Sequence, residues 1–269
     1  MAPDPLLSAE NVSRLFAQRG GLFARQSWLR AVDGVSLTIA HGETVAIVGE
    51  SGSGKSTLGR MLLGLLAPSE GTVRFRGEAL GDLRGAAWRR FRREVQVVFQ
   101  DSSASLNPRR RIGDSVAVPL RWNLGLGRAA AAQRAAALLD QVGLPAEQFF
   151  ARLPHMLSGG QRQRVGIARA LASEPSVVVA DEPVSALDVS VRAQVLRLMR
   201  QLQADRGLAY LFITHDLGVV RAIADRVVVM RGGVVVEHGP VAAVLDAPRH
   251  GYTRALLAAT PMPRGLLSR

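Results

Sequence analysis

A loop with the composition of a phosphate-binding site is the clearest chemical feature of the chain. Residues 49–57 read GESGSGKST and fit the pattern G-x-x-x-x-G-K-[S/T] at every position. In this pattern backbone N–H groups surround the phosphates, the lysine reaches the β- and γ-phosphates, and the hydroxyl after the lysine binds Mg²⁺. The predicted nucleotide-binding residues are Gly49, Glu50, Ser51, Gly52, Ser53, Gly54, Lys55, Ser56 and Thr57, with Ser56 as a metal ligand and Lys55 also in a catalytic role.

Lys55 is the only lysine among the 34 basic residues, and all the others are arginine. Lysine carries a compact charge on a slim stem, whereas arginine ends in a wide planar group. We infer that the loop closes around its anion too tightly for arginine. The flanks agree, because residues 44–48 (TVAIV) are typical of a buried strand and residues 58–66 have the apolar spacing of a helix.

Two adjacent acids follow another apolar run, in residues 177–182 (VVVADE). At the end of a buried strand, Asp181 is predicted to hold Mg²⁺, usually through water, beside the phosphate loop. Glu182 is then placed to orient or deprotonate a water that attacks the γ-phosphate. Alone, the pair could equally cap the next helix. Its combination with the Lys55 loop favours the catalytic interpretation.

Residues 157–161 read LSGGQ and precede Arg162-Gln163-Arg164 and a helix predicted over 165–172. A Ser-Gly-Gly turn that opens a helix directs backbone N–H groups and a positive dipole end at an anion. The same three residues alone would indicate no more than a serine N-cap. The whole pentapeptide, placed shortly before the acid-tipped strand, resembles the signature sequence of ATP-binding-cassette (ABC) ATPases.

Further segments resemble motifs of that family in the expected order. Residues 97–101 (VVFQD) are similar to the Q-loop, whose glutamine, here Gln100, touches Mg²⁺ or the attacking water. Residues 185–188 (SALD) resemble the D-loop, which ends here at Asp188. Residues 214–216 (THD) match the switch histidine, here His215, which the resemblance places against the γ-phosphate.

Residues 11–16 (NVSRLF) resemble the family segment whose last aromatic residue stacks on adenine. Phe16 is the preferred candidate, with Phe23 and Trp28 as alternatives because the intervening residues blur the register. The resemblance spans roughly residues 8 to 260. It implies that ATP and Mg²⁺ are the cofactors and that two cassettes hold two ATP molecules head to tail. The residues expected to act on the partner's ATP are Ser158, Gly159, Gly160, Gln161 and Asp188.

Segments outside the catalytic motifs resemble the peptide/nickel importer subfamily. They are residues 100–109, which end SLNPR, the pair Pro154-His155, and residues 247–257 (APRHGYTRALL). The intact GGQRQR run resembles the second of two paired ATPases, so a distinct partner cassette is expected, with a homodimer as the alternative. Peptide import is the first expectation. Nickel import is the second, because Ser102-Ser103 is closer to some nickel-type members.

The resemblance also implies partners and a location. We expect two transmembrane permease subunits, an extracytoplasmic solute-binding protein that acts indirectly, and a peripheral position on the cytoplasmic face of the inner membrane. Residues 1–13 show no secretory signal, and no apolar run reaches the 18 residues typical of a spanning helix. The absence of cysteine excludes disulfides, thiolate zinc sites and iron–sulfur clusters.

The net charge of +12 leaves nucleic-acid binding as a rival interpretation. The arginine cluster that suggests it has few interleaved aromatics, which favours a solvated helical face or a surface beside a membrane. A DNA-repair or translation ATPase of this family would need a second cassette or a long coiled coil, and a small-molecule kinase would have no use for LSGGQ. We therefore expect no nucleic-acid partner. The cluster comprises Arg84, Arg89, Arg90, Arg92, Arg93, Arg109, Arg110 and Arg111.

The elements that must position these motifs predict an α/β fold: a P-loop NTPase core of the ABC ATPase type with an antiparallel β subdomain and an inserted helical subdomain. Strands are predicted over 35–39, 72–76, 176–180, 209–213, 226–230 and 234–237, and a helix over 129–142. The predicted division assigns residues 1–100 and 158–238 to the ATP-binding core with its β subdomain. Residues 101–157 form the helical subdomain and residues 239–269 a C-terminal extension.

Overall fold

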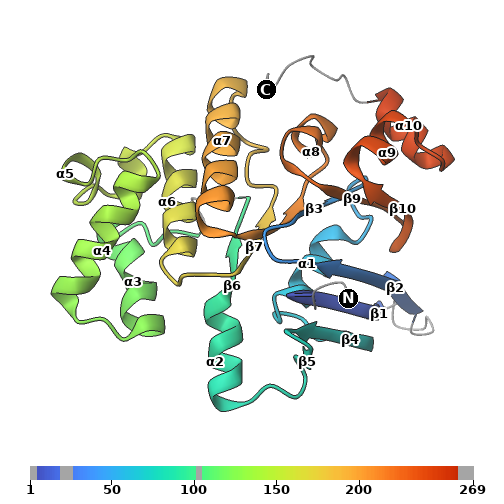
Figure 1. The fold of residues 1–269 in the computed structure, drawn as a ribbon, viewed down its shortest axis with the longest axis horizontal. Helices are drawn as coiled ribbons and strands as arrows, with labels where there is room; N and C mark the ends of the chain where they lie inside the picture. Colours follow the sequence, from blue (N-terminus) through green and yellow to red (C-terminus); the bar gives the residue numbers. More distant parts are fainter. Residues whose placement is uncertain (1–4, 19–26, 101–104, 260–269) are drawn as a thin grey trace. The chain divides into compact units, whose positions relative to one another are not determined.

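The computed structural model of the chain describes residues 5–18, 27–100 and 105–259. These residues form two compact units, each of which is described by itself. Unit 1 comprises Met1–Arg84 and Ala209–Arg269, and unit 2 comprises Gly85–Leu208. Figure 1 shows the elements of both units in sequence colours.

Unit 1 contains an antiparallel sheet with strand order β2-β1-β4-β5. Its strands are β1 (Leu7–Gln18), β2 (Ser27–Ile39), β4 (Glu70–Phe75) and β5 (Glu78–Ala79). Leu7 faces Ile39 on one side and Phe75 on the other, and all three side chains are buried. Exposed residues alternate with buried ones along the end of β2, as expected for a sheet with one wet face. The predicted antiparallel strands over 35–39 and 72–76 are confirmed.

The second group of strands in unit 1 has the order β10-β9-β3-β8. Strand β3 (Thr44–Val48) lies between β8 (Ala209–Ile213) and β9 (Arg226–Arg231) and is parallel to both, whereas β10 (Val234–Pro240) is antiparallel to β9. Every residue of β3 and β8 is buried. Helices α1 (Lys55–Leu62) and α8 (Leu217–Ile223) contact this sheet, and α9 (Val241–Asp246) contacts both β10 and α10 (Gly251–Ala259).

Unit 2 begins with α2 (Gly85–Glu94) and the strand β6 (Val95–Val98), which pairs in parallel with β7 (Val177–Asp181). Between these strands the regular elements of the described residues are helices: α3 (Ile112–Leu124), α4 (Arg128–Gln141), α5 (Ala146–Phe149), the short 3₁₀ helix η1 (Pro154–Met156) and α6 (Gly159–Leu171). Helix α7 (Val189–Arg206) follows β7. Among the described helices, none combines the length and the apolar character needed to cross a membrane.

Several element boundaries differ from the predictions. Helix α1 begins at Lys55 and ends at Leu62, not over 58–66, because Gly54 caps it in the left-handed region. Helix α6 begins at Gly159, six residues before the predicted start at 165, because Ser158 caps it and both glycines take helical geometry. Helices α7 and α8 were not predicted. The arginines of α2 (Arg89, Arg90, Arg92 and Arg93) are exposed, as a solvated face requires.

Candidate functional site

The phosphate loop, residues 49–57, closes tightly around the ammonium group of Lys55. The Lys55 side chain is buried, and its Nζ donates hydrogen bonds to Gly49 O at 2.7 Å, Glu50 O at 2.6 Å and Ser53 Oγ at 3.3 Å. An ammonium group has three N–H donors, and these acceptors lie close together inside the loop. This geometry agrees with the inference that the position suits a slim cation.

Close packing against backbone carbonyls from other segments of unit 1 explains two of the loop glycines. A Cβ atom added to Gly49 would lie 2.1 Å from the carbonyl oxygen of Met230, and one on Gly54 would lie 2.4 Å from that of Ala31. Gly52 differs, because a Cβ there would meet no heavy atom within 4 Å. Its φ of +80° still favours glycine. The loop is therefore packed against the protein at both ends and open in the middle, where phosphate groups would enter.

Other predicted residues of unit 1 follow the strands that neighbour the loop. Ser56 and Thr57 lie half-buried in the first turn of α1. His215 follows β8 and is exposed. Its position is set on both sides, because Thr214 N donates to Ile47 O at 3.1 Å and the Asp216 carboxylate caps α8. The imidazole is therefore exposed at the carboxyl end of a strand that neighbours β3, the strand that leads into the loop.

The adenine candidates lie in the antiparallel sheet of unit 1. Phe16 is half-buried in β1, and the Arg14 guanidinium lies 4.9 Å from its ring centroid. Trp28 faces Ala17 on the neighbouring strand and is 61% exposed, so it has the more accessible ring. Phe23 lies outside the described residues. The choice of Phe16 remains a prediction.

In unit 2 the structure brings Gln100 and Glu182 together. The Gln100 amide nitrogen donates to the Glu182 carboxylate at 3.2 Å. The contact follows from the parallel register, which places Val98 opposite Ala180, so that both side chains leave the same end of the strand pair. Asp181 is the last residue of β7 and is half-buried.

Backbone strain accompanies this placement. Glu182 has a φ of +47°, an unusual conformation for a residue with a side chain. The turn is held by Ser185, whose N and Oγ donate to Glu182 O at 3.3 and 3.1 Å. Strain of this kind costs about 1–3 kcal/mol and is found where the side chain must point in a particular direction. Here it directs the carboxylate toward Gln100.

The signature loop, Leu157–Gln161, forms a complete capping box. Ser158 Oγ accepts from Gln161 N at 3.3 Å, and Gln161 Oε1 accepts from Ser158 N at 2.9 Å. Gly159 and Gly160 occupy the first turn of α6, and a Cβ on Gly160 would lie 2.3 Å from Val191 Cγ1 in α7. Asp188 is the exposed N-cap residue of α7.

The donor set suits Mg²⁺ bound together with nucleotide phosphates. Among the described residues, no group of three or more His, Cys, Asp or Glu side chains could hold a metal ion. Mg²⁺ is usually held by only one or two protein ligands plus phosphate oxygens and water. The predicted ligands Ser56, Gln100 and Asp181 supply hydroxyl, amide and carboxylate oxygens, which are the hard ligands this ion prefers. Ser56 belongs to unit 1 and the other two belong to unit 2.

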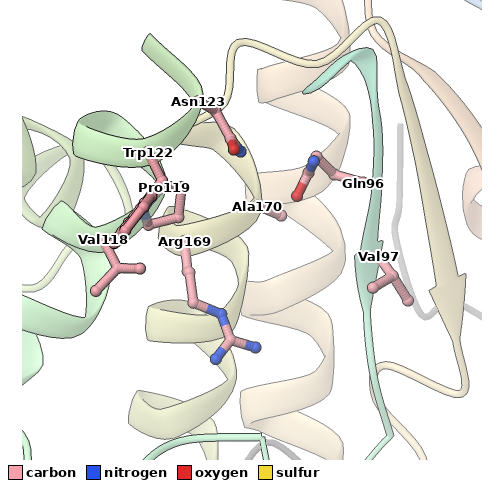
Figure 2. Close-up of a pocket in the computed structure, with 8 residues that line it drawn as sticks. All are labelled: Gln96, Val97, Val118, Pro119, Trp122, Asn123, Arg169 and Ala170. Carbon is pink, nitrogen blue, oxygen red and sulfur yellow. The ribbon is translucent and has the colours of Figure 1, made fainter. Parts of the chain in front are cut away.

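Sequence reasoning missed a pocket of about 290 Å³ in unit 2. It lies among α3, α6 and β6, and Figure 2 shows Asn123 and Gln96 pointing toward each other across it. Burial lowers the pKa of the Arg169 guanidinium, which donates to Ser105 O. Trp122, which lines the pocket, is 83% exposed, and its exposure could not be read from the sequence. The lining residues are Gln96, Val97, Val118, Pro119, Trp122, Asn123, Arg169 and Ala170.

The family model described as "ABC transporter" matches residues 32–185, a span that includes the phosphate loop, the signature loop and the Asp181-Glu182 pair. The chain belongs to this family. As an ABC ATPase, it is an enzyme that binds and hydrolyses ATP. The expected fold class is confirmed by the solved ABC cassettes that it resembles.

Two curated relatives and one solved structure illustrate this membership. The dipeptide transport ATP-binding protein DppF of Haemophilus influenzae is 49% identical over 259 residues, which cover 96% of this chain and 78% of the relative. The glutathione import ATP-binding protein GsiA of Salmonella typhimurium is 49% identical over 261 residues, covering 96% of this chain and 42% of that protein. The structure is a dimeric post-hydrolysis state of the cassette MJ0796 bound to ADP and phosphate, with a TM-score of 0.76, 31% identity, and coverage of 87% of this chain and 98% of that one.

Proposed function

We propose that this ABC ATPase powers the import of dipeptides or oligopeptides. The observation that carries the proposal is the near-half identity, over almost the whole chain, to ATPases named for dipeptide and glutathione transport. Glutathione is itself a small peptide, so both names indicate one chemical class of solute. Nickel import remains the alternative raised by Ser102-Ser103, which lies outside the described residues.

The phosphates of ATP would bind in the loop of residues 49–57. The Lys55 ammonium already lies among the loop carbonyls, so phosphate oxygens can replace those acceptors with little movement of the side chain. Ser56, Gln100 and Asp181 would hold Mg²⁺, which neutralises charge on the β- and γ-phosphates. Phe16 would stack on the adenine, and His215 would contact the γ-phosphate.

Glu182 would act as the general base. Its carboxylate takes a proton from the attacking water, whose oxygen forms a bond to the γ-phosphorus while the bond to the β–γ bridging oxygen breaks. The hydrogen bond from Gln100 supports this role, because it orients the carboxylate and joins it to the segment that leads into the inserted helices. The products are ADP and inorganic phosphate.

A second cassette would complete each site. We infer that Ser158, Gly159, Gly160, Gln161 and Asp188 act on the ATP held by the partner, and that the partner is a distinct subunit. ATP then closes the pair and hydrolysis reopens it. The predicted division into core, helical subdomain (101–157) and C-terminal extension (239–269) belongs to the same proposal.

Two permease subunits and an extracytoplasmic solute-binding protein would complete the importer, with this chain on the cytoplasmic face of the inner membrane. The exposed Trp122 and the pocket beside it support a docking role for this part of unit 2. No role for nucleic acid is proposed, since the arginines of α2 form an exposed helical face, whereas the aromatic pair of that helix, Trp88 and Phe91, is half-buried and buried and does not offer open rings to bases.

The test is ATP hydrolysis by the complex reconstituted with its permease subunits, partner cassette and binding protein. A binding protein loaded with a dipeptide should stimulate hydrolysis, whereas stimulation by a nickel-loaded protein alone would refute peptide import. Glu182→Gln should lower turnover at least about 100-fold while ATP binding persists. The control Glu147→Gln changes an exposed acid in α5 and should turn over like the unaltered chain. Normal turnover in Glu182→Gln would refute the assignment of the base.

A further inference from the structure

A tyrosine near the C-terminal end of unit 1 contacts the phosphate loop directly. The hydroxyl of Tyr252, in the first turn of α10, accepts a hydrogen bond from Glu50 N at 3.0 Å. The side chain is buried, with 6% of its surface exposed. The two residues are separated by 202 positions, so neither motif alone indicates the contact.

The contact involves the same peptide unit that Lys55 binds. The amide N–H of Glu50 and the carbonyl of Gly49 belong to one planar trans peptide and point in opposite directions. Tyr252 accepts from the N–H, and the Lys55 ammonium donates to the carbonyl at 2.7 Å. Rotation of this peptide plane would break both hydrogen bonds. Tyr252 therefore holds the acceptor that orients the lysine.

Tyr252 is itself held in place from several directions. The Arg231 guanidinium lies 5.0 Å from the centroid of the Tyr252 ring. The backbone N of Tyr252 donates to His250 Nδ1 at 3.1 Å. The Glu237 carboxylate of β10 accepts from the backbone N atoms of Arg249 at 2.7 Å and His250 at 3.1 Å. These bonds fasten the segment before α10 to the edge strand β10.

The charge state of Glu237 is consistent with this attachment. Burial raises the pKa of its carboxyl, but the nearby Thr253 hydroxyl and the hydrogen bonds from the Arg249 and His250 amides lower the pKa by more. The pKa of the Glu237 carboxyl is thus below its ordinary value, and the group is ionised at neutral pH. An ionised acceptor makes the stronger hydrogen bonds with the two amides.

We propose that Tyr252 is a positioning residue for the phosphate loop and that its hydroxyl raises the affinity of the loop for ATP. This role for Tyr252 would make the segment of residues 247–257 part of the support for nucleotide binding. The inference rests on the role of the Lys55 loop proposed above. Because the tyrosine acts on the resting shape of the loop, its contribution is the same before and during the reaction. It should therefore change the KM for ATP and leave kcat unaltered.

The experiment compares Tyr252→Phe with Tyr210→Phe in the full chain. Phenylalanine keeps the ring, its burial and the contact with Arg231, and removes only the hydroxyl. Tyr210, the other tyrosine, is buried in β8 opposite Thr44, at the end of β3 far from the loop. The Kd for ATP, measured by titration calorimetry, and the KM should rise about two- to tenfold in Tyr252→Phe, as expected for one lost hydrogen bond. Neither should change in Tyr210→Phe.

The outcomes separate this inference from the proposed function. An unaltered Kd in Tyr252→Phe, or an equal loss in Tyr210→Phe, would overturn the positioning role while leaving the nucleotide site intact. A fall in kcat at constant KM would also overturn it. Failure of the unaltered chain to bind ATP would instead refute the function of the Lys55 loop.

Discussion

The phosphate loop and the signature loop both place glycines just before or within the first turn of a helix, but the glycines serve different purposes. In the phosphate loop, Gly49, Gly52 and Gly54 all have positive φ, and Gly54 caps α1 without a side chain. In the signature loop, Gly159 and Gly160 take ordinary helical angles after a serine cap. Similar composition therefore produces two different kinds of helix start.

The two loops differ in which groups satisfy their hydrogen-bond donors and acceptors. The carbonyls of the phosphate loop accept from the buried Lys55, so a cation is the centre around which the loop is built. In the signature loop the hydrogen-bond partners come from the loop itself, since Ser158 and Gln161 each donate a backbone N–H to the side chain of the other. In the first loop, a buried cation can exchange its carbonyl acceptors for the phosphate oxygens of a nucleotide. In the second, the hydrogen bonds are closed within one capping box, which suits a site that is completed only when a partner brings a ligand.

The largest expected effect that tests this contrast is that of Gly54→Ala. Its Cβ would lie 2.4 Å from a backbone carbonyl and would sit at a φ of +100°. Overpacking and strain together should cost about 2–5 kcal/mol of unfolding free energy and abolish tight ATP binding. Chemical denaturation and ATP titration of the purified chain measure the two losses.

The matched control is Gly159→Ala in the signature loop. Its Cβ would meet only Leu187 Cδ2, at an ordinary distance of 3.7 Å. Since alanine is the better helix former, stability should be unchanged or about 0.5–1 kcal/mol higher. Equal destabilisation by the two substitutions would remove the contrast drawn between the loops.

Features with chemistry local to the sequence could be predicted. The G-K-S motif requires its residues to be neighbours in the chain, and the strand over 44–48 matches the prediction at both ends. The acid pair after residues 177–180 also lies where the apolar run ends. Helix boundaries were less accurate, because the left-handed Gly54 and the cap at Ser158 decide where α1 and α6 begin.

Contacts between distant residues could not be predicted in this way. The bond between Gln100 and Glu182 depends on the register of β6 and β7, which apolar runs do not specify. The bond between Tyr252 and Glu50 depends on how α10 is fastened to β10 through Glu237. Both arise from tertiary packing, and a single sequence carries no periodic pattern for them.

Lys55→Arg tests whether the phosphate loop, in contrast to the signature loop, is built around a slim buried cation. The ammonium lies within 3.3 Å of three acceptors in a buried space, and a planar guanidinium cannot occupy that space without opening the loop. We expect ATP to bind at least about tenfold more weakly, roughly 1.4 kcal/mol, as measured by calorimetry. The reverse exchange Arg60→Lys, at an exposed position of α1, should leave the affinity unchanged. Full affinity in Lys55→Arg would show that the loop does not select the slim cation.

The smallest effect is expected from Ser158→Ala, which removes the cap of α6 and leaves the phosphate loop untouched. Loss of the cap should lower the unfolding free energy by about 1 kcal/mol, while the isolated chain binds ATP as before. Ser158→Asp separates the cap from the proposed contact with the partner's ATP. Aspartate is an equally good N-cap, so stability should return. Its carboxylate would repel the γ-phosphate, so cooperative hydrolysis by the assembled pair should stay low. If Ser158→Asp restored both stability and hydrolysis, the serine would be a structural cap alone, and the signature loop would not act on the partner's nucleotide through this side chain.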